Sequence, residues 1–91
     1  MPRNKTMIRR LLEGTDLTLH ERPSYMRISS PLSTVAYAFG RSDGSLRLQV
    51  RRPDGMYPDV LFVESDADLP TVREKLERAE GRLNRAKVKA A

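Results

Sequence analysis

The stretch TVAYAFGRSDGSLRLQVRRPDGMYPDVLFV, residues 34–63, predicts three antiparallel strands joined by a tight turn and a longer loop. Within it, residues 46–51 (LRLQVR) alternate strictly between apolar and polar side chains. A period of two is typical of a strand with one face in the core and the other in water. We therefore expect this part of the chain to form the centre of a small sheet.

The Asp-Gly dipeptide at positions 43–44 predicts a two-residue hairpin turn, because both central positions of such a turn need a positive φ. With that turn, Phe39 faces Leu48 across the two strands. Tyr37 likewise faces Val50, and we expect both pairs in the core. The opposite face then carries small residues beside polar ones, namely Ala36, Ala38, Gly40, Arg47, Gln49 and Arg51.

Two interpretations of this second face stay open. Ala36, Ala38 and Gly40 form a flat floor over which a rigid partner such as DNA can approach the backbone, while arginines reach bases or phosphates. The same floor also suits a helix of this chain, or plain solvent, with the arginine side chains extending at its margins.

The chain before and after the hairpin adds further elements. Residues 1–13 predict a short basic helix that stops at Gly14. In residues 15–29, apolar and polar side chains alternate both before and after Pro23. This pattern fits two short strands or one irregular excursion. Residues 60–63 (VLFV) have no polar alternation, which indicates a strand covered on both sides.

Residues 69–88 predict an amphipathic helix that begins near Pro70. Its apolar stripe is Leu69, Val72, Leu76, Ala79, Leu83 and Ala86. We expect this stripe to cover the apolar sheet face, with a homodimer interface along Val72, Leu76 and Leu83 as the alternative. The chain thus predicts one α+β domain over residues 1–91, with a short N-terminal helix, an antiparallel three- to five-stranded meander sheet over residues 15–63, and a C-terminal amphipathic helix packed on one sheet face.

The composition favours a binding protein over an enzyme. Seventeen basic residues face 12 acidic ones, for a net charge of +5, and thirteen of the basic residues are arginine. Arginine suits phosphates and guanine edges, although a GC-rich coding sequence produces the same bias. Cysteine is absent, and the single histidine, His20, has no second metal ligand beyond a flanking Glu21. Without a phosphate loop or nucleophile motif, we expect no enzyme and no cofactor.

The sequence also carries no membrane signal. No apolar run approaches the length of a membrane span, and the start MPRNKTMIRR lacks the apolar core of a signal peptide. We therefore expect a cytoplasmic protein, in a cell or in an infected host, without a membrane partner.

The leading hypothesis is a small nucleic-acid-binding module that uses a basic sheet face, with DNA as the favoured partner. Arg47, Gln49 and Arg51 are the residues expected to face the DNA groove. Further basic residues expected to contact nucleic acid are Arg9, Arg10, Arg41, Arg52, Arg82 and Arg85.

Three strands followed by an amphipathic helix, with an arginine-bearing middle strand, resemble the ethylene-response-factor type of DNA-binding domain and the arm-binding domains of tyrosine integrases. The resemblance covers about residues 36–86 and depends on GSLRLQVR (44–51), the Asp54-Gly55 turn, Leu61-Phe62 and the helix after Asp68. It implies that the helix packs on one sheet face and that the other face enters the major groove. The order of helix, three strands and helix is also similar to double-stranded-RNA-binding domains.

The alternative hypothesis is a small inhibitor or adaptor that binds a host protein complex, of the kind that phages and plasmids encode. Residues 53–72 contain no basic residue, so their carboxylates could imitate a polyanion. The residues expected at such a protein interface are Asp54, Asp59, Glu64 and Asp66.

Overall fold

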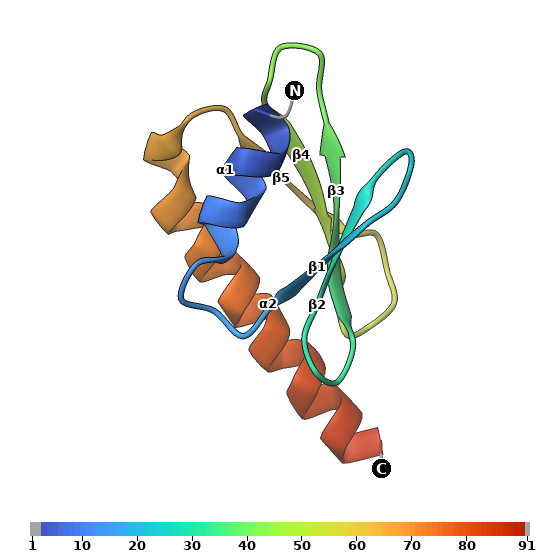
Figure 1. Ribbon diagram of the computed structural model, residues 1–91. Coiled ribbons are helices and arrows are strands. Elements are labelled where there is room, and N and C mark those ends of the chain that lie inside the picture. Colours follow the sequence, from blue (N-terminus) through green and yellow to red (C-terminus); the bar gives the residue numbers. More distant parts are fainter. Residues whose placement is uncertain (1–2, 91) are drawn as a thin grey trace.

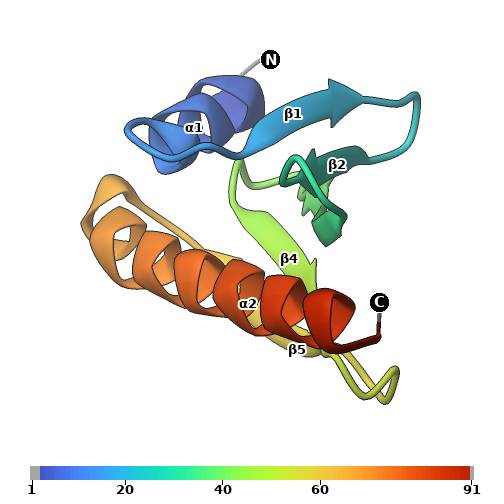
Figure 2. The same ribbon diagram turned by 90° about the horizontal axis from the view of Figure 1, so that it is seen from below.

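The computed structural model describes residues 3–90 as a five-stranded antiparallel sheet with both helices on one of its faces (Figures 1 and 2). In chain order the elements are α1 (Arg3–Leu12), β1 (Thr18–Glu21), β2 (Met26–Ser29), β3 (Thr34–Gly40), β4 (Leu46–Val50), β5 (Asp59–Val63), the 3-10 helix η1 (Asp66–Asp68) and α2 (Leu69–Ala90). The strands form a meander in the order β1-β2-β3-β4-β5. The predicted α+β class, meander sheet and C-terminal helix are confirmed.

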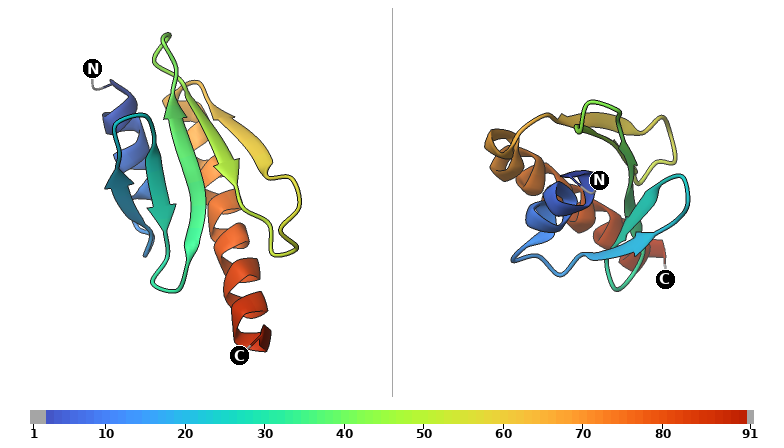
Figure 3. Two further views of the ribbon diagram at one scale, coloured as in Figure 1. Left: turned by 90° about the vertical axis from the view of Figure 1, so that its right-hand side faces the viewer. Right: turned by 45° about the horizontal axis from the view of Figure 1, so that its top comes forward.

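The core lies between the sheet and the helices. The buried strand residues are Met26, Ile28, Val35, Ala36, Ala38, Leu46, Leu48, Val50 and Val63. The apolar stripe of α2 packs on them, with Leu76 fully buried at 0% exposure and Val72 and Leu83 almost so. This stripe therefore faces the sheet of its own chain, as expected. Figure 3 shows α2 behind the strands, with its C-terminal end extending past them.

Helix α1 packs beside α2 on the same face of the sheet, and a side chain of α2 forms hydrogen bonds with the C-terminal end of α1. Met7, Ile8 and Leu11 are buried. Arg73 donates from Nε to the Leu11 carbonyl over 2.8 Å and from a terminal nitrogen to the Arg10 carbonyl over 2.6 Å. These carbonyls belong to the last turn of α1, where cations and hydrogen-bond donors are favourable.

The hairpin between β3 and β4 has a three-residue loop, and the predicted two-residue turn is wrong. Arg41 N donates to the Ser45 carbonyl over 2.9 Å, and Gly44 N donates to the Arg41 carbonyl over 3.0 Å. Gly44 has φ +91°, as the last position of such a loop requires. The Asp43 carboxylate accepts from both N and Oγ of Ser45, over 2.9 and 2.6 Å, which holds this longer loop in place.

The extra loop residue shifts the strand register by one and so moves alternate side chains to the other face. Ala38 pairs with Leu48, and Phe39 pairs with Arg47. The prediction that Tyr37 and Phe39 lie in the core is therefore wrong. The alanines are instead buried in contact with α2, so of the two interpretations the helix floor is correct for them.

Strand β5 lies at the edge of the sheet, and the prediction that it is covered on both sides is wrong. Val60 and Phe62 are 48% and 46% exposed, whereas Val63, on the opposite face, is buried. The helices cover only one sheet face (Figure 2). Below, the uncovered sheet face is called the open face; its strand residues include His20, Arg27, Tyr37, Phe39, Arg47, Gln49, Val60 and Phe62.

Candidate functional site

The open face carries two rows of side chains that run across the strands. The first row takes one residue from each of the five strands, in the order His20, Arg27, Tyr37, Gln49 and Val60. The second row lies two residues further along the strands and places Arg47 between Phe39 and Phe62. Aromatic rings and arginines thus alternate over the centre of the face.

An aromatic cluster lies over β2 and β3. The Tyr25 ring meets the Tyr37 ring edge-on, with 5.7 Å between centroids, and lies 6.2 Å from the Phe39 ring. Tyr25 belongs to the loop between β1 and β2, which borders the open face (Figure 1). Both distances are typical of favourable aromatic pairs, so the rings support one another on the sheet surface.

Two arginines lie over rings of this face. The Arg47 guanidinium carbon is 4.9 Å from the centre of the Phe39 ring, and that of Arg41 is 5.4 Å from the centre of the Phe62 ring. These cation–π contacts hold planar guanidinium groups on the surface while keeping their charge exposed.

The electrostatic character of the open face is positive. Arg27 lies beside Tyr37 in the first row, and its Nε is buried without a hydrogen-bond partner in the described part of the chain. None of the described strands carries a carboxylate on this face. Asp43, in the loop between β3 and β4, accepts two hydrogen bonds from Ser45, which lower the pKa of its carboxyl group below the usual value of 3.8.

Two shallow hollows lie on the open face, each with a ring and an arginine at its wall. One, of about 370 Å³, is lined by Phe39, Gly40, Arg41, Arg47 and Phe62. The other, of about 260 Å³, is lined by Tyr37, Gln49, Arg51, Arg52, Gly55, Met56 and Pro58. The loop between β4 and β5 supplies one wall of the second hollow. Both hollows are wide open and suit flat groups rather than an enclosed small molecule.

The structure brings together part of the predicted binding set. Arg41, Arg47 and Gln49 lie on or beside the open face, as the hypothesis requires. Arg51 follows β4 directly; it donates from a terminal nitrogen to the Thr34 carbonyl over 3.0 Å and lines the second hollow. These four residues form one continuous surface.

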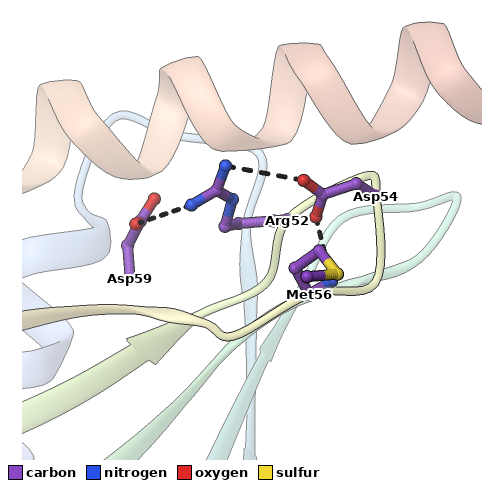
Figure 4. Close-up of polar contacts among 4 residues, drawn as sticks. All are labelled: Arg52, Asp54, Met56 and Asp59. Atoms are coloured by element: carbon purple, nitrogen blue, oxygen red, sulfur yellow. Dashed lines mark hydrogen bonds and ion pairs between the residues drawn. The ribbon is translucent and has the colours of Figure 1, made fainter.

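Arg52 is held by acidic residues of the same chain (Figure 4). Its guanidinium nitrogens lie 3.5 Å from an Asp54 oxygen and 3.8 Å from an Asp59 oxygen. Asp54 also accepts from the backbone N of Met56 over 2.9 Å, which shapes the loop. Arg52, predicted to contact nucleic acid, thus pairs with two carboxylates that were predicted to contact a protein.

The other predicted arginines lie on the helices, away from the open face. Arg10 pairs with Asp66 over 2.9 Å, and Arg9 lies 3.8 Å from Glu21. Arg82 and Arg85 are exposed on α2. The nine predicted residues are therefore divided between the open face, the loop after β4 and the two helices. Of the predicted acidic set, Asp54, Asp59 and Asp66 are paired with arginines, and Glu64 is exposed after β5.

Sequence reasoning missed most of the aromatic part of the site. Tyr37 and Phe39 were assigned to the core because the register was placed one residue away. Tyr25 and Arg27 lie in residues 15–29, where the sequence pattern fits either two short strands or one irregular excursion and so does not assign these side chains to a face. Residues 34–40 carry a usable signal, because small and bulky side chains alternate along them. A helix that packs closely on the sheet favours the face with the alanines. Tyr37 and Phe39 then lie on the face that the helix does not cover.

One perturbed acid lies on the helix side of the molecule. Glu80 of α2 is 9% exposed, and its burial, a hydrogen bond with Asp16 and the negative charges of Asp16 and Glu77 raise its pKa to about 7. Burial is the largest of these causes. Because α2 covers the opposite face of the sheet, this group is separate from the open face.

Among the residues that the structure describes, no three histidine or acidic side chains come together as a metal site, and no helix is long and apolar enough to cross a membrane. Comparison of the chain with protein-family models, with curated proteins and with solved structures found no match.

Proposed function

We propose that the protein binds nucleic acid through the open face of its sheet. The observation that carries this proposal is the combination of Arg27, Arg41 and Arg47 with exposed or half-buried rings on a strand surface that holds no carboxylate. Phosphates are attracted by the guanidinium groups, and bases have flat faces that stack on rings and on guanidinium planes. The chemistry of the surface therefore matches both parts of a nucleotide.

DNA is the expected partner on the ground of the resemblance described above, since its sheet face is the one that meets the bases. Gln49 adds an amide at the centre of the same face, where it can donate to and accept from a base edge. Arg51 at the end of β4 extends the positive surface towards the second hollow.

The salt dependence of binding tests this proposal. Four arginines, Arg27, Arg41, Arg47 and Arg51, lie at the open face or its margin. If each neutralises one phosphate, the logarithm of the affinity falls with the logarithm of the salt concentration with a slope of about −3 to −4. Fluorescence anisotropy of a labelled oligonucleotide between about 50 and 200 mM salt measures this slope. Absence of binding at the lower concentration would overturn the proposal.

The acidic-interface alternative has less support. Three of its four carboxylates, those of Asp54, Asp59 and Asp66, lie within 4 Å of an arginine of the same chain, at 3.5, 3.8 and 2.9 Å. Their charge is thus partly compensated where a polyanion mimic would need it exposed.

A further inference from the structure

The arrangement of rings on the open face bears on which form of nucleic acid it takes, a question that rests on the proposed function. Tyr37 and Phe39 are two residues apart on β3, which places their attachment points about 7 Å from each other. Bases stacked in a duplex repeat every 3.4 Å or so along each strand. Neighbouring bases cannot remain stacked on each other while each lies on one of these rings.

The two hollows repeat the same chemistry at this wider spacing. The first combines Phe39 and Phe62 with Arg41 and Arg47, and the second combines Tyr37 with Gln49 and Arg51. Each hollow therefore offers a ring for the face of one base and a guanidinium group for a phosphate or a second base face. Two adjacent sites of this kind fit two consecutive nucleotides of an extended strand.

The width of the open face argues against a duplex groove. The residues of the face come from strands β1 to β5, whose axes together span about 19 Å at the usual strand spacing. The major groove of DNA is about 12 Å wide and admits a helix or a two-stranded ribbon. The loops 22–25 and 51–58 border the face and broaden it further (Figures 1 and 3).

Among the rings on the strands of the open face, Phe62 is the most exposed. It is 46% exposed on the edge strand β5, and the Arg41 guanidinium that lies over its ring comes from the loop between β3 and β4 rather than from the core. A base can stack on the ring itself or on the outer plane of that guanidinium. Ordinary monomeric surfaces leave single apolar side chains exposed, but this one completes a row with Arg47 and Phe39.

From these relationships we infer that the open face binds single-stranded nucleic acid. One base lies on the Phe39 and Phe62 rings of the first hollow, and the next base, no longer stacked on it, lies on the Tyr37 ring of the second. The sugar-phosphate backbone runs along Arg41, Arg47 and Arg51. Duplex DNA or RNA is bound more weakly, through its phosphates alone. Sequence preference is modest, because stacking accepts every base.

The test compares oligothymidine and oligouridine of about 12 nucleotides with a duplex of the same length, by fluorescence anisotropy with the full chain. We expect at least about tenfold tighter binding of a single strand than of the duplex. Stronger binding of oligouridine identifies RNA as the source of the strand and stronger binding of oligothymidine identifies DNA; either supports the inference. Duplex binding equal to or tighter than both single strands overturns it but leaves the proposed function standing. Binding of none of the three overturns both.

Variants of Phe62 separate stacking from charge. Phe62→Leu removes the ring without changing charge, and we expect it to weaken single-strand binding by about fivefold or more while duplex binding stays unchanged. Phe62→Trp keeps a ring and should restore the affinity. The exposed position predicts unchanged thermal unfolding for both variants, which circular dichroism checks. Equal single-strand affinity of Phe62→Leu and the parent chain overturns the stacking arrangement.

Discussion

The guanidinium group of Arg47 lies over the ring of Phe39, 4.9 Å from its centre, and the two residues are direct partners across β4 and β3. This contact exists only because the hairpin loop has three residues. With a two-residue turn, Phe39 would face Leu48 in the core and Arg47 would stand over Gly40. The open face thus owes its combination of rings and arginines to the local structure of one loop.

The planar shape of Arg47 is expected to matter as well as its charge. Arg47→Lys keeps the charge but loses the guanidinium plane, so affinity for an oligonucleotide should fall severalfold while the salt slope stays the same. Arg47→Gln removes the charge, so the slope should become shallower by about 0.7 for a single strand. Anisotropy titrations at several salt concentrations measure both. Wild-type affinity for Arg47→Lys would show that only charge is used.

The hairpin loop can be tested through Gly44, whose φ of +91° is unfavourable for any residue with a Cβ. Gly44→Ala should destabilise the fold by about 1 kcal/mol or more. The matched control is Gly81→Ala in α2, where the added Cβ meets only the flexible end of Arg85 at 3.4 Å. That change should stabilise the helix by up to about 1 kcal/mol. Urea unfolding measures the change in unfolding free energy for both variants. A change of the same sign in the two would contradict the loop described here.

The apolar stripe of α2 is expected to act within the chain and not between chains. Leu76 has 0% exposure, so Leu76→Ala should cost about 2–5 kcal/mol of unfolding free energy. The melting temperature should not depend on protein concentration, because the stripe contacts the sheet of the same chain. A concentration-dependent melt, lost in Leu76→Ala, would instead indicate dimerisation through this stripe.

Glu80 predicts a pH dependence of stability. Its pKa is raised from the usual 4.5 to about 7 by burial and by Asp16 and Glu77. The folded chain therefore holds the carboxyl proton of Glu80 more tightly than the unfolded chain does. The resulting stability is fully present below about pH 4.5 and is lost as the pH rises through about 7. Glu80→Gln should therefore raise the unfolding free energy at pH 8, by about 1 kcal/mol after allowance for partial solvation.

The control for this prediction is the exposed Glu64, whose change to Gln should leave the pH profile of stability as it is. Thermal unfolding of the parent chain and both variants from pH 4 to 8 or so gives the comparison. A fall in stability of the same size in Glu80→Gln as in the parent chain would show that another group causes it.

The sequence was sufficient for the architecture but not for the side chains on each face. Alternation in residues 46–51 and the stripe of α2 predict the sheet, the helix and their contact, because both periods reflect burial. The Asp-Gly dipeptide, in contrast, suits either a two-residue turn or the last positions of a three-residue loop. The choice depends on the hydrogen bonds between Asp43 and Ser45, and an error of one residue exchanges Tyr37 and Phe39 with the alanines.

The same strand alternation predicted part of the candidate site. Arg47 and Gln49 keep their exposed face in either register, since β4 buries its leucines in both. The pairing of Arg52 with Asp54 and Asp59 depends on the path of the loop between β4 and β5, which alternation does not describe. The exposure of Phe62 depends on β5 being the last strand, a property of the whole sheet.

The central claim is that the open face, and not the net charge of the chain, binds nucleic acid. Two double variants with the same loss of charge test it most directly: Arg41→Gln with Arg47→Gln on the open face, and Arg82→Gln with Arg85→Gln on α2. In anisotropy titrations of one oligonucleotide at one salt concentration, the open-face variant should lose about tenfold or more in affinity, and the α2 variant less than about threefold. Equal losses in the two variants, or a larger loss in the α2 variant, would contradict the claim.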